Sequence, residues 1–218
     1  MGVDVWLPAA GSGPALVLIP AIFGMSTHIR TVADRLASAG YVVGAPDLFW
    51  RVAPGWVADA DEAGMAAAME TAGKLDRSAA TDDCGAVADH LAALADVHGT
   101  PGVIGFCLGG TLAFATAIRY QPSVCVSYYG SGVGALLGEI GEVSCPTLFH
   151  FGSRDRSIPG EAVEQVASAI DDRGHLALNV EIAGHAFDDE APMFHDESAA
   201  KSAWAKTMAF LEEHLPVT

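Results

Sequence analysis

Positive charge is scarce in this chain, and the shortage restricts the partners that the protein can have. Its 218 residues include 11 Lys and Arg against 27 Asp and Glu, which gives a formal net charge of −16. A field of this sign repels the phosphates of nucleic acids and anionic membrane surfaces. We therefore expect neither nucleic acid nor a membrane as a partner, and an anionic substrate would need basic groups gathered locally.

Long apolar runs are also missing, although 51% of the residues are hydrophobic. No run approaches the roughly 18 uninterrupted apolar residues that a membrane-spanning helix needs. The first ten residues, MGVDVWLPAA, lack the basic and apolar regions of a secretory signal. We expect a cytoplasmic protein that forms one α/β domain over residues 1–218 with a sizeable core.

The cysteines are few and show no pairing pattern. Cys84, Cys107, Cys125 and Cys145 have no CxxC spacing, which disfavours a disulfide framework and a zinc site. The histidines show no metal-binding spacing such as HExxH. We expect no metal and no cofactor, and we expect every cysteine except Cys107 to be a small buried core residue.

Apolar runs alternate with amphipathic stretches, which predicts an α/β fold of βα units with a mostly parallel central sheet and helices on both faces. The residues between 56 and 74 predict either a helix or a cap-like excursion. Strands are expected at 15–20, 41–46, 102–106, 124–130, 145–153 and 175–184, and helices at 26–40, 76–99, 107–120, 161–173 and 196–214.

The segment GFCLGG places Cys107 between Gly105 and Gly109, directly after an apolar strand and before a helix. One interpretation is a small core residue at a tight turn. The other is a nucleophile on a strained strand-to-helix elbow, where the glycines avoid collisions and the helix N-terminus favours the thiolate.

Two downstream residues favour the nucleophile. Asp155 follows the strand that ends near Phe151, and His185 follows the strand that ends near Ile182. Hydrolases of the α/β fold carry nucleophile, acid and base in this chain order. His185 would act on the thiol, and Asp155 would fix the imidazole tautomer. An oxyanion hole would use the N–H groups of Leu108 and, from the AIFG loop, Ile22.

These motifs resemble the dienelactone hydrolase family over nearly the whole chain. IFG, APDLF, GFCLGG, YYG, FGSRD with a following IP, and AGHAF recur in this order. The resemblance implies a monomeric α/β-hydrolase that opens a lactone or cleaves a small-molecule ester through an acyl-cysteine. It carries the triad onto Cys107, Asp155 and His185, and the oxyanion amides onto Ile22 and Leu108.

The chain departs from the family at two places. The family has a glutamate that contacts the resting thiol, and here Ala21 stands in its place; this predicts either a permanently activated thiolate paired with His185 or a differently tuned site. A family arginine that binds a carboxylate corresponds to Asp189, preceded by Asp188, and two acids at the mouth would repel an anionic lactone. The basic residues that could compensate are Arg51, Arg77, Arg154 and Arg156.

The sequence thus predicts a cysteine-dependent ester or lactone hydrolase whose substrate is neutral rather than the family's anionic dienelactone. The alternative is a non-catalytic or redox-sensing binding protein that keeps the hydrolase fold. The candidate pocket residues are Ala21, Phe49, Trp50, Tyr128, Tyr129 and Phe187.

Overall fold

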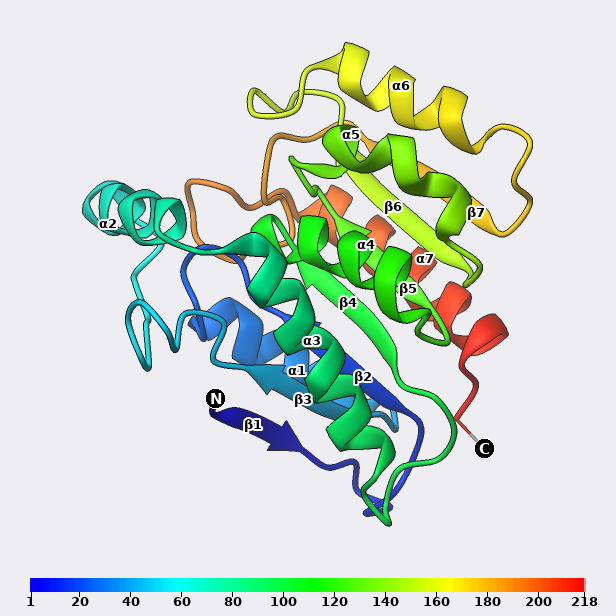
Figure 1. The fold of residues 1–218 in the computed structure, drawn as a ribbon. Helices are drawn as coiled ribbons and strands as arrows, with labels where there is room; N and C mark the ends of the chain where they lie inside the picture. Colours follow the sequence, from blue (N-terminus) through cyan, green and yellow to red (C-terminus); the bar gives the residue numbers. More distant parts are fainter. Residues whose placement is uncertain (218) are drawn as a thin grey trace.

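The computed structural model describes residues 1–217, and its strands form one seven-stranded sheet (Figure 1). The strand order is β1-β3-β2-β4-β5-β6-β7, and every neighbouring pair is parallel except β1 with β3. The strands are β1 Val3–Trp6, β2 Ala15–Ile19, β3 Val42–Pro46, β4 Gly102–Phe106, β5 Cys125–Tyr128, β6 Thr147–Gly152 and β7 Leu176–Glu181.

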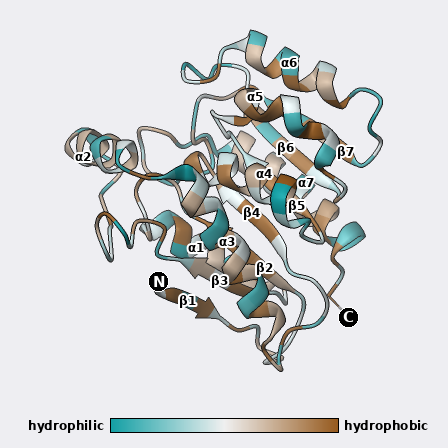
Figure 2. Ribbon diagram, in the orientation of Figure 1, coloured by the Kyte–Doolittle hydropathy of each residue, from teal (hydrophilic) through white to brown (hydrophobic). Residues whose placement is uncertain are grey.

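The middle of this sheet is apolar and closed to solvent. Every residue of β2, β3, β4, β5 and β6 is buried, and brown, hydrophobic segments are visible on β4 and β6 in Figure 2. Parallel strands that are covered on both faces need such continuous apolar runs. The mostly parallel α/β-hydrolase sheet predicted from the sequence is therefore confirmed.

Helices cover both faces of the sheet (Figure 1). Helices α3 (Arg77–Ala92) and α4 (Leu108–Tyr120) pack against each other on one face, and α1 (Thr27–Ser38) and α7 (Glu197–His214) lie on the other. Helix α1 buries Ile29, Val32 and Leu36, one stripe at helical spacing. The other helical segments are α2 (Glu62–Gly73), α5 (Val133–Leu136), the 3-10 helix η1 (Leu137–Glu142) and α6 (Gly160–Ile170).

The structure corrects the sequence prediction in detail. Helix α3 ends at Ala92 rather than at residue 99, because the chain beyond it pairs with the loop before β2: the N–H of His98 donates to the carbonyl of Gly13 at 3.0 Å. The region 56–74 contains a helix, α2, which begins after the cap residue Asp61. Strand β1, helix α5 and η1 were not predicted.

In residues 1–217, no helix combines the length and the apolar character that crossing a membrane requires.

Candidate active site

Cys107 occupies a strained backbone position between β4 and α4. Its φ and ψ angles are 54° and −113°, outside the regions that residues with a side chain normally adopt, at a cost of about 1–3 kcal/mol. The surrounding structure holds this conformation: the N–H of Cys107 donates to the carbonyl of Tyr128 at 3.0 Å, and the carbonyl of Cys107 accepts from the N–H of Thr111 at 3.2 Å. The strain turns the side chain away from the sheet at the N-terminus of a helix.

The two glycines flanking the cysteine are required by close backbone packing. A Cβ atom at Gly105 would lie 2.0 Å from the carbonyl oxygen of Gly109, and a Cβ atom at Gly109 would lie 2.1 Å from that of Ile19. Backbone atoms cannot withdraw as a flexible side chain can. The glycine spacing therefore allows the turn to be this sharp.

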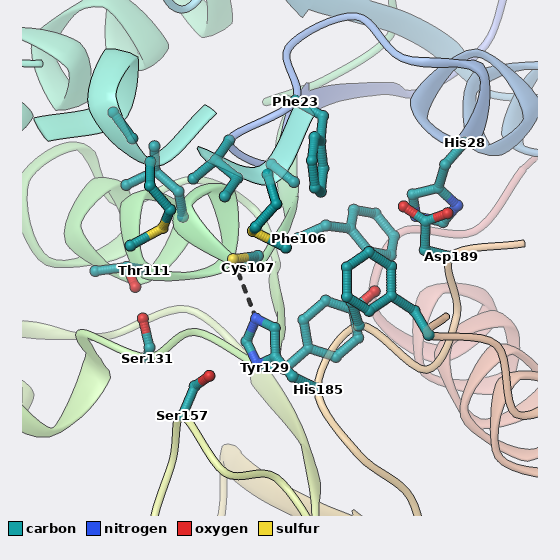
Figure 3. A pocket seen from close by; sticks show the side chains of 18 of the residues that line it. Phe23, His28, Phe106, Cys107, Thr111, Tyr129, Ser131, Ser157, His185 and Asp189 are labelled. Carbon is teal, nitrogen blue, oxygen red and sulfur yellow. Dashed lines mark hydrogen bonds between the residues drawn. The ribbon is translucent and has the colours of Figure 1, made fainter. Parts of the chain in front are cut away.

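His185 bridges Cys107 and Asp155. Its Nε2 lies 3.1 Å from the Sγ of Cys107, the contact drawn in Figure 3, and its Nδ1 lies 2.6 Å from Oδ2 of Asp155. The second carboxylate oxygen of Asp155 accepts the N–H groups of Ser157, at 2.7 Å, and Ile158, at 3.2 Å. The Asp155 side chain is fully buried, so its orientation is fixed from both sides.

The environment favours the imidazolium form of His185. Burial disfavours the charged ring, but the hydrogen bonds with Asp155 and Cys107 outweigh it and raise the pKa of His185 to about 10. At neutral pH both ring nitrogens then carry protons, and Nε2 donates toward the sulfur. The arrangement suits a thiolate paired with an imidazolium.

The two residues predicted for the oxyanion hole, Ile22 and Leu108, both border the cavity that contains Cys107. Among residues 1–217, neither of their N–H groups donates a hydrogen bond to a protein acceptor. The carbonyl of Ile22 accepts the indole N–H of Trp56 at 2.9 Å, which fixes the orientation of this loop.

The cavity at the sulfur has a volume of about 350 Å³ and is mostly apolar. Of the residues predicted for the pocket, Ala21 and Tyr129 line it. Sequence reasoning missed the apolar residues that helix α2 contributes and several residues around the sulfur. The residues missed include Phe23, His28, Met65, Met69, Phe106 and Phe194.

Four aromatic residues predicted for the pocket do not line it. Phe49 and Phe187 are fully buried in the core. The indole N–H of Trp50 donates to Asp83 at 3.0 Å, and the hydroxyl of Tyr128 is hydrogen bonded to Thr207 at 2.7 Å. The polar atoms of Trp50 and Tyr128 are thus satisfied elsewhere, while the rings of Tyr128 and Phe187 pack against the lining rings of Phe106 and Tyr129.

The charges near the cavity also differ from the prediction. Asp189 lines the cavity, but Asp188 is buried behind it with a side chain that has no exposed surface, so it does not lie at the mouth. Arg77 is the one Lys or Arg among the described lining residues. Arg51 forms an ion pair with Asp83 and does not line the cavity. Within residues 1–217, no cluster of three or more His, Cys, Asp or Glu is arranged to hold a metal ion.

The fold, with its elbow at the end of a central strand, defines an α/β-hydrolase. The sequence model of the dienelactone hydrolase family matches residues 2–215 of this chain. The chain therefore belongs to that family, whose members hydrolyse ester or lactone bonds.

Several known proteins are similar to this chain. A carboxymethylenebutenolidase of Pseudomonas sp. strain P51 is 32% identical over 99% of this chain and 91% of its own length. Carboxymethylenebutenolidase 1 of Cupriavidus pinatubonensis is 30% identical over 96% and 90%. The solved structure of a dienelactone hydrolase-like promiscuous phosphotriesterase from metagenomic libraries has a TM-score of 0.79 at 23% identity, covering 98% of this chain and 92% of its own.

Proposed function

We propose that this protein hydrolyses a small, non-anionic ester or lactone through an acyl-enzyme formed on Cys107, with His185 and Asp155 completing a triad. The observation that carries the proposal is the 3.1 Å separation of the Cys107 sulfur and the His185 Nε2 atom inside an apolar cavity. A nucleophile within hydrogen-bond reach of a base, itself oriented by a buried carboxylate, is the arrangement that covalent catalysis requires.

In the first half of the reaction, the thiolate of Cys107 attacks the carbonyl carbon and forms a carbon–sulfur bond, while the carbonyl electron pair moves onto oxygen. The N–H groups of Ile22 and Leu108 receive the oxyanion. When this intermediate collapses, the bond to the leaving oxygen breaks, and that oxygen takes the Nε2 proton of His185. In a lactone the leaving oxygen stays attached to the acyl chain.

In the second half, neutral His185 accepts a proton from water as the water oxygen attacks the thioester. The new intermediate expels the Cys107 thiolate, which restores the ion pair with the imidazolium. The acid product ionises and releases its proton to solvent. Asp155 keeps the Nδ1 proton in place during both halves.

The apolar lining supports a substrate without an anionic group. Arg77 is the one Lys or Arg among the described lining residues and Asp189 adds a negative charge to them, in contrast to the arginine clamp of the family. A carboxylate entering this cavity would gain little attraction and lose its hydration.

The proposal is tested with p-nitrophenyl acetate and Cys107→Ala. We expect a burst of p-nitrophenol from the unmodified protein, an acetyl adduct on the peptide that contains Cys107 by mass spectrometry, and a loss of about a thousandfold or more in kcat/KM for Cys107→Ala. Circular dichroism checks that the variant is folded. Cys145→Ala, which removes a buried thiol outside the cavity, is the control and should keep the activity. Undiminished turnover by folded Cys107→Ala would refute the proposed chemistry.

A further inference from the structure

One end of the cavity carries polar groups that the proposed mechanism does not use. His28, the second residue of α1, and Asp189, in the loop after His185, both line the cavity although they are only 6% and 7% exposed. In Figure 3 they lie together on one side of Cys107, and Thr111 and Ser131 lie on the other. A substrate whose carbonyl carbon reaches the sulfur can therefore extend toward His28 and Asp189.

Oδ1 of Asp189 accepts the N–H of Ala191 at 2.9 Å, but several other buried polar atoms at or behind this end lack partners within the protein. Among residues 1–217, five buried side-chain nitrogen or oxygen atoms have no hydrogen-bond partner, and four of them belong to His28, Asp188 and Tyr129. They are Nε2 of His28, both carboxylate oxygens of Asp188 and the hydroxyl of Tyr129. Buried polar atoms are normally satisfied, so their concentration beside one end of the cavity points to a ligand.

The charge at this end is negative, although Arg35 of α1 acts on Asp188 and His28 from beyond ion-pair distance and Arg77 lines the same cavity. Nε2 of His28 lies 3.9 Å from Oδ2 of Asp188, and no Lys or Arg of the described chain forms an ion pair with Asp188 or Asp189. Burial lowers the pKa of His28, against the opposing effect of Asp189 and Glu190, so the ring is neutral and offers no positive charge. Burial raises the pKa of Asp188 to about 7.

Aromatic rings surround these acids. Phe23, Phe106, Tyr129 and Phe194 line the same cavity as His28 and Asp189. The rings of His28 and Phe106 meet edge to face at 5.2 Å, and those of Phe23 and Phe194 lie 6.1 Å apart. Aromatic faces attract cations, and they do so more strongly where water is excluded.

We propose that the His28–Asp189 end of the cavity binds an alkylammonium group, and that the substrate is an ester or lactone carrying this cation a few bonds from its reacting carbonyl. This inference rests on the proposed hydrolase function and makes its substrate class specific. Asp189 supplies the charge at the cavity surface, Asp188 strengthens it from behind, and the aromatic rings replace the hydration of the cation. His28, as a neutral ring, accepts a hydrogen bond when the ammonium carries a proton.

The test compares esters that differ only in charge. One pair is acetylthiocholine and the thioacetate in which carbon replaces its quaternary nitrogen. The other is the p-nitrophenyl ester of trimethylammoniobutanoate and its carbon isostere, because either the leaving group or the acyl chain could reach Asp189. In at least one pair we expect kcat/KM for the cationic ester to be about tenfold higher or more. Equal or lower values for the cation in both pairs would overturn the inference.

Two charge-matched variants separate a binding site from the general negative field. Asp189→Asn should lower the ratio of cationic to neutral kcat/KM by about tenfold. Glu190→Gln removes the same charge from the next residue, which is exposed and does not line the cavity, and should change the ratio by less than about threefold. Equal effects of the two variants would mean that no specific site exists.

Calorimetric titration with butyltrimethylammonium chloride gives a readout that needs no catalysis. We expect a saturable site in the unmodified protein that Asp189→Asn loses and Glu190→Gln keeps. Binding of the cation without hydrolysis of any ester would contradict the proposed function and the substrate class, and would leave only the alkylammonium site standing. Hydrolysis of all four esters with no charge preference and no cation binding would support the proposed function and overturn this inference.

Discussion

His185 and Asp155 are joined by a 2.6 Å contact between Nδ1 and Oδ2, and the other oxygen of Asp155 is held by two backbone N–H groups. The carboxylate is thus anchored to its own loop on one side and to the imidazole on the other. Of the groups that raise the pKa of His185 to about 10, the hydrogen bond to Asp155 ranks first. In the proposed mechanism, this contact would set the pH range over which His185 can give a proton to a leaving group.

The first prediction concerns the alkaline limb of activity. A histidine with a raised pKa keeps its proton to higher pH, so kcat/KM should stay high through neutral pH and fall with a midpoint near 10. Asp155→Asn removes the main stabilisation of the imidazolium, so the midpoint should move to lower pH and kcat should fall by about two to four orders of magnitude. The measurement is the pH dependence of kcat/KM with an ester of a poorly acidic alcohol.

Asp172→Asn serves as the comparison, because Asp172 is exposed beyond α6 and does not line the cavity. Its pH profile should match that of the unmodified protein. A midpoint near 6.5 in the unmodified protein would show that the contact with Asp155 does not act as described.

The second prediction concerns the elbow. Gly109→Ala brings a Cβ within 2.1 Å of the Ile19 carbonyl oxygen, so either β2 or the elbow must shift. We expect a loss of about 2–4 kcal/mol in the free energy of unfolding and a large loss of activity. Gly134→Ala is the matched change: the site is helical and open, and stability should stay the same or rise by about 0.4–1 kcal/mol. Urea denaturation distinguishes them, and equal midpoints would contradict the packing argument.

The third prediction concerns the loop that carries Ile22. Trp56→Phe removes the indole N–H that binds the Ile22 carbonyl at 2.9 Å, so the backbone of Ile22, whose own N–H would contribute to the oxyanion hole, becomes less well held. We expect kcat to fall about fivefold, the equivalent of one net hydrogen bond of about 1 kcal/mol, with a smaller change in KM. Trp204→Phe is the comparison: Trp204 lies on α7, its ring packs against Arg35 of α1 and does not line the cavity, and kcat should stay unchanged. An effect on KM alone would exclude an orienting role.

The fourth prediction concerns stability behind the site. The hydroxyl of Thr207 lies 2.7 Å from that of Tyr128 and 2.9 Å from Nε2 of His150, and all three residues are buried. Thr207→Val leaves two buried polar atoms without a partner, and it should cost about 2 kcal/mol or more of the free energy of unfolding. Thr207→Ser keeps the hydroxyl and should retain most of the free energy of unfolding that Thr207→Val loses. If valine proves as stable as threonine in thermal unfolding, the hydroxyl is dispensable.

The sequence predicted those elements of the fold whose signal is local. The buried run at β2 and the apolar stripe of α1 each determine their own structure, and both were identified. Strand β1 was not predicted because its four residues are partly exposed and become a strand only by pairing with β3. Helix α5 and η1 are short and rich in glycine, and they form against neighbouring elements.

The residues of the candidate site also fall into two groups: those that the local sequence predicts and those that only folding brings to the site. Cys107, Asp155 and His185 could be proposed because each follows a strand of one sheet, and the ends of neighbouring parallel strands meet. The pocket wall could not be predicted, since Met65 and Met69 reach it from α2, far along the chain, and Tyr128 turns toward Thr207 instead. His28 had one usable signal, its position in the first turn of the helix after the AIFG loop.

The four cysteines differ sharply in accessibility, and this has a practical consequence. Cys84 and Cys125 have no exposed surface, and Cys145 is only 5% exposed; burial raises the pKa of all three, that of Cys84 to about 12. Cys107 alone is partly open and opens onto the cavity. An alkylating reagent applied to the native protein should therefore consume one equivalent per chain, so a simple thiol count becomes a direct assay of cavity occupancy.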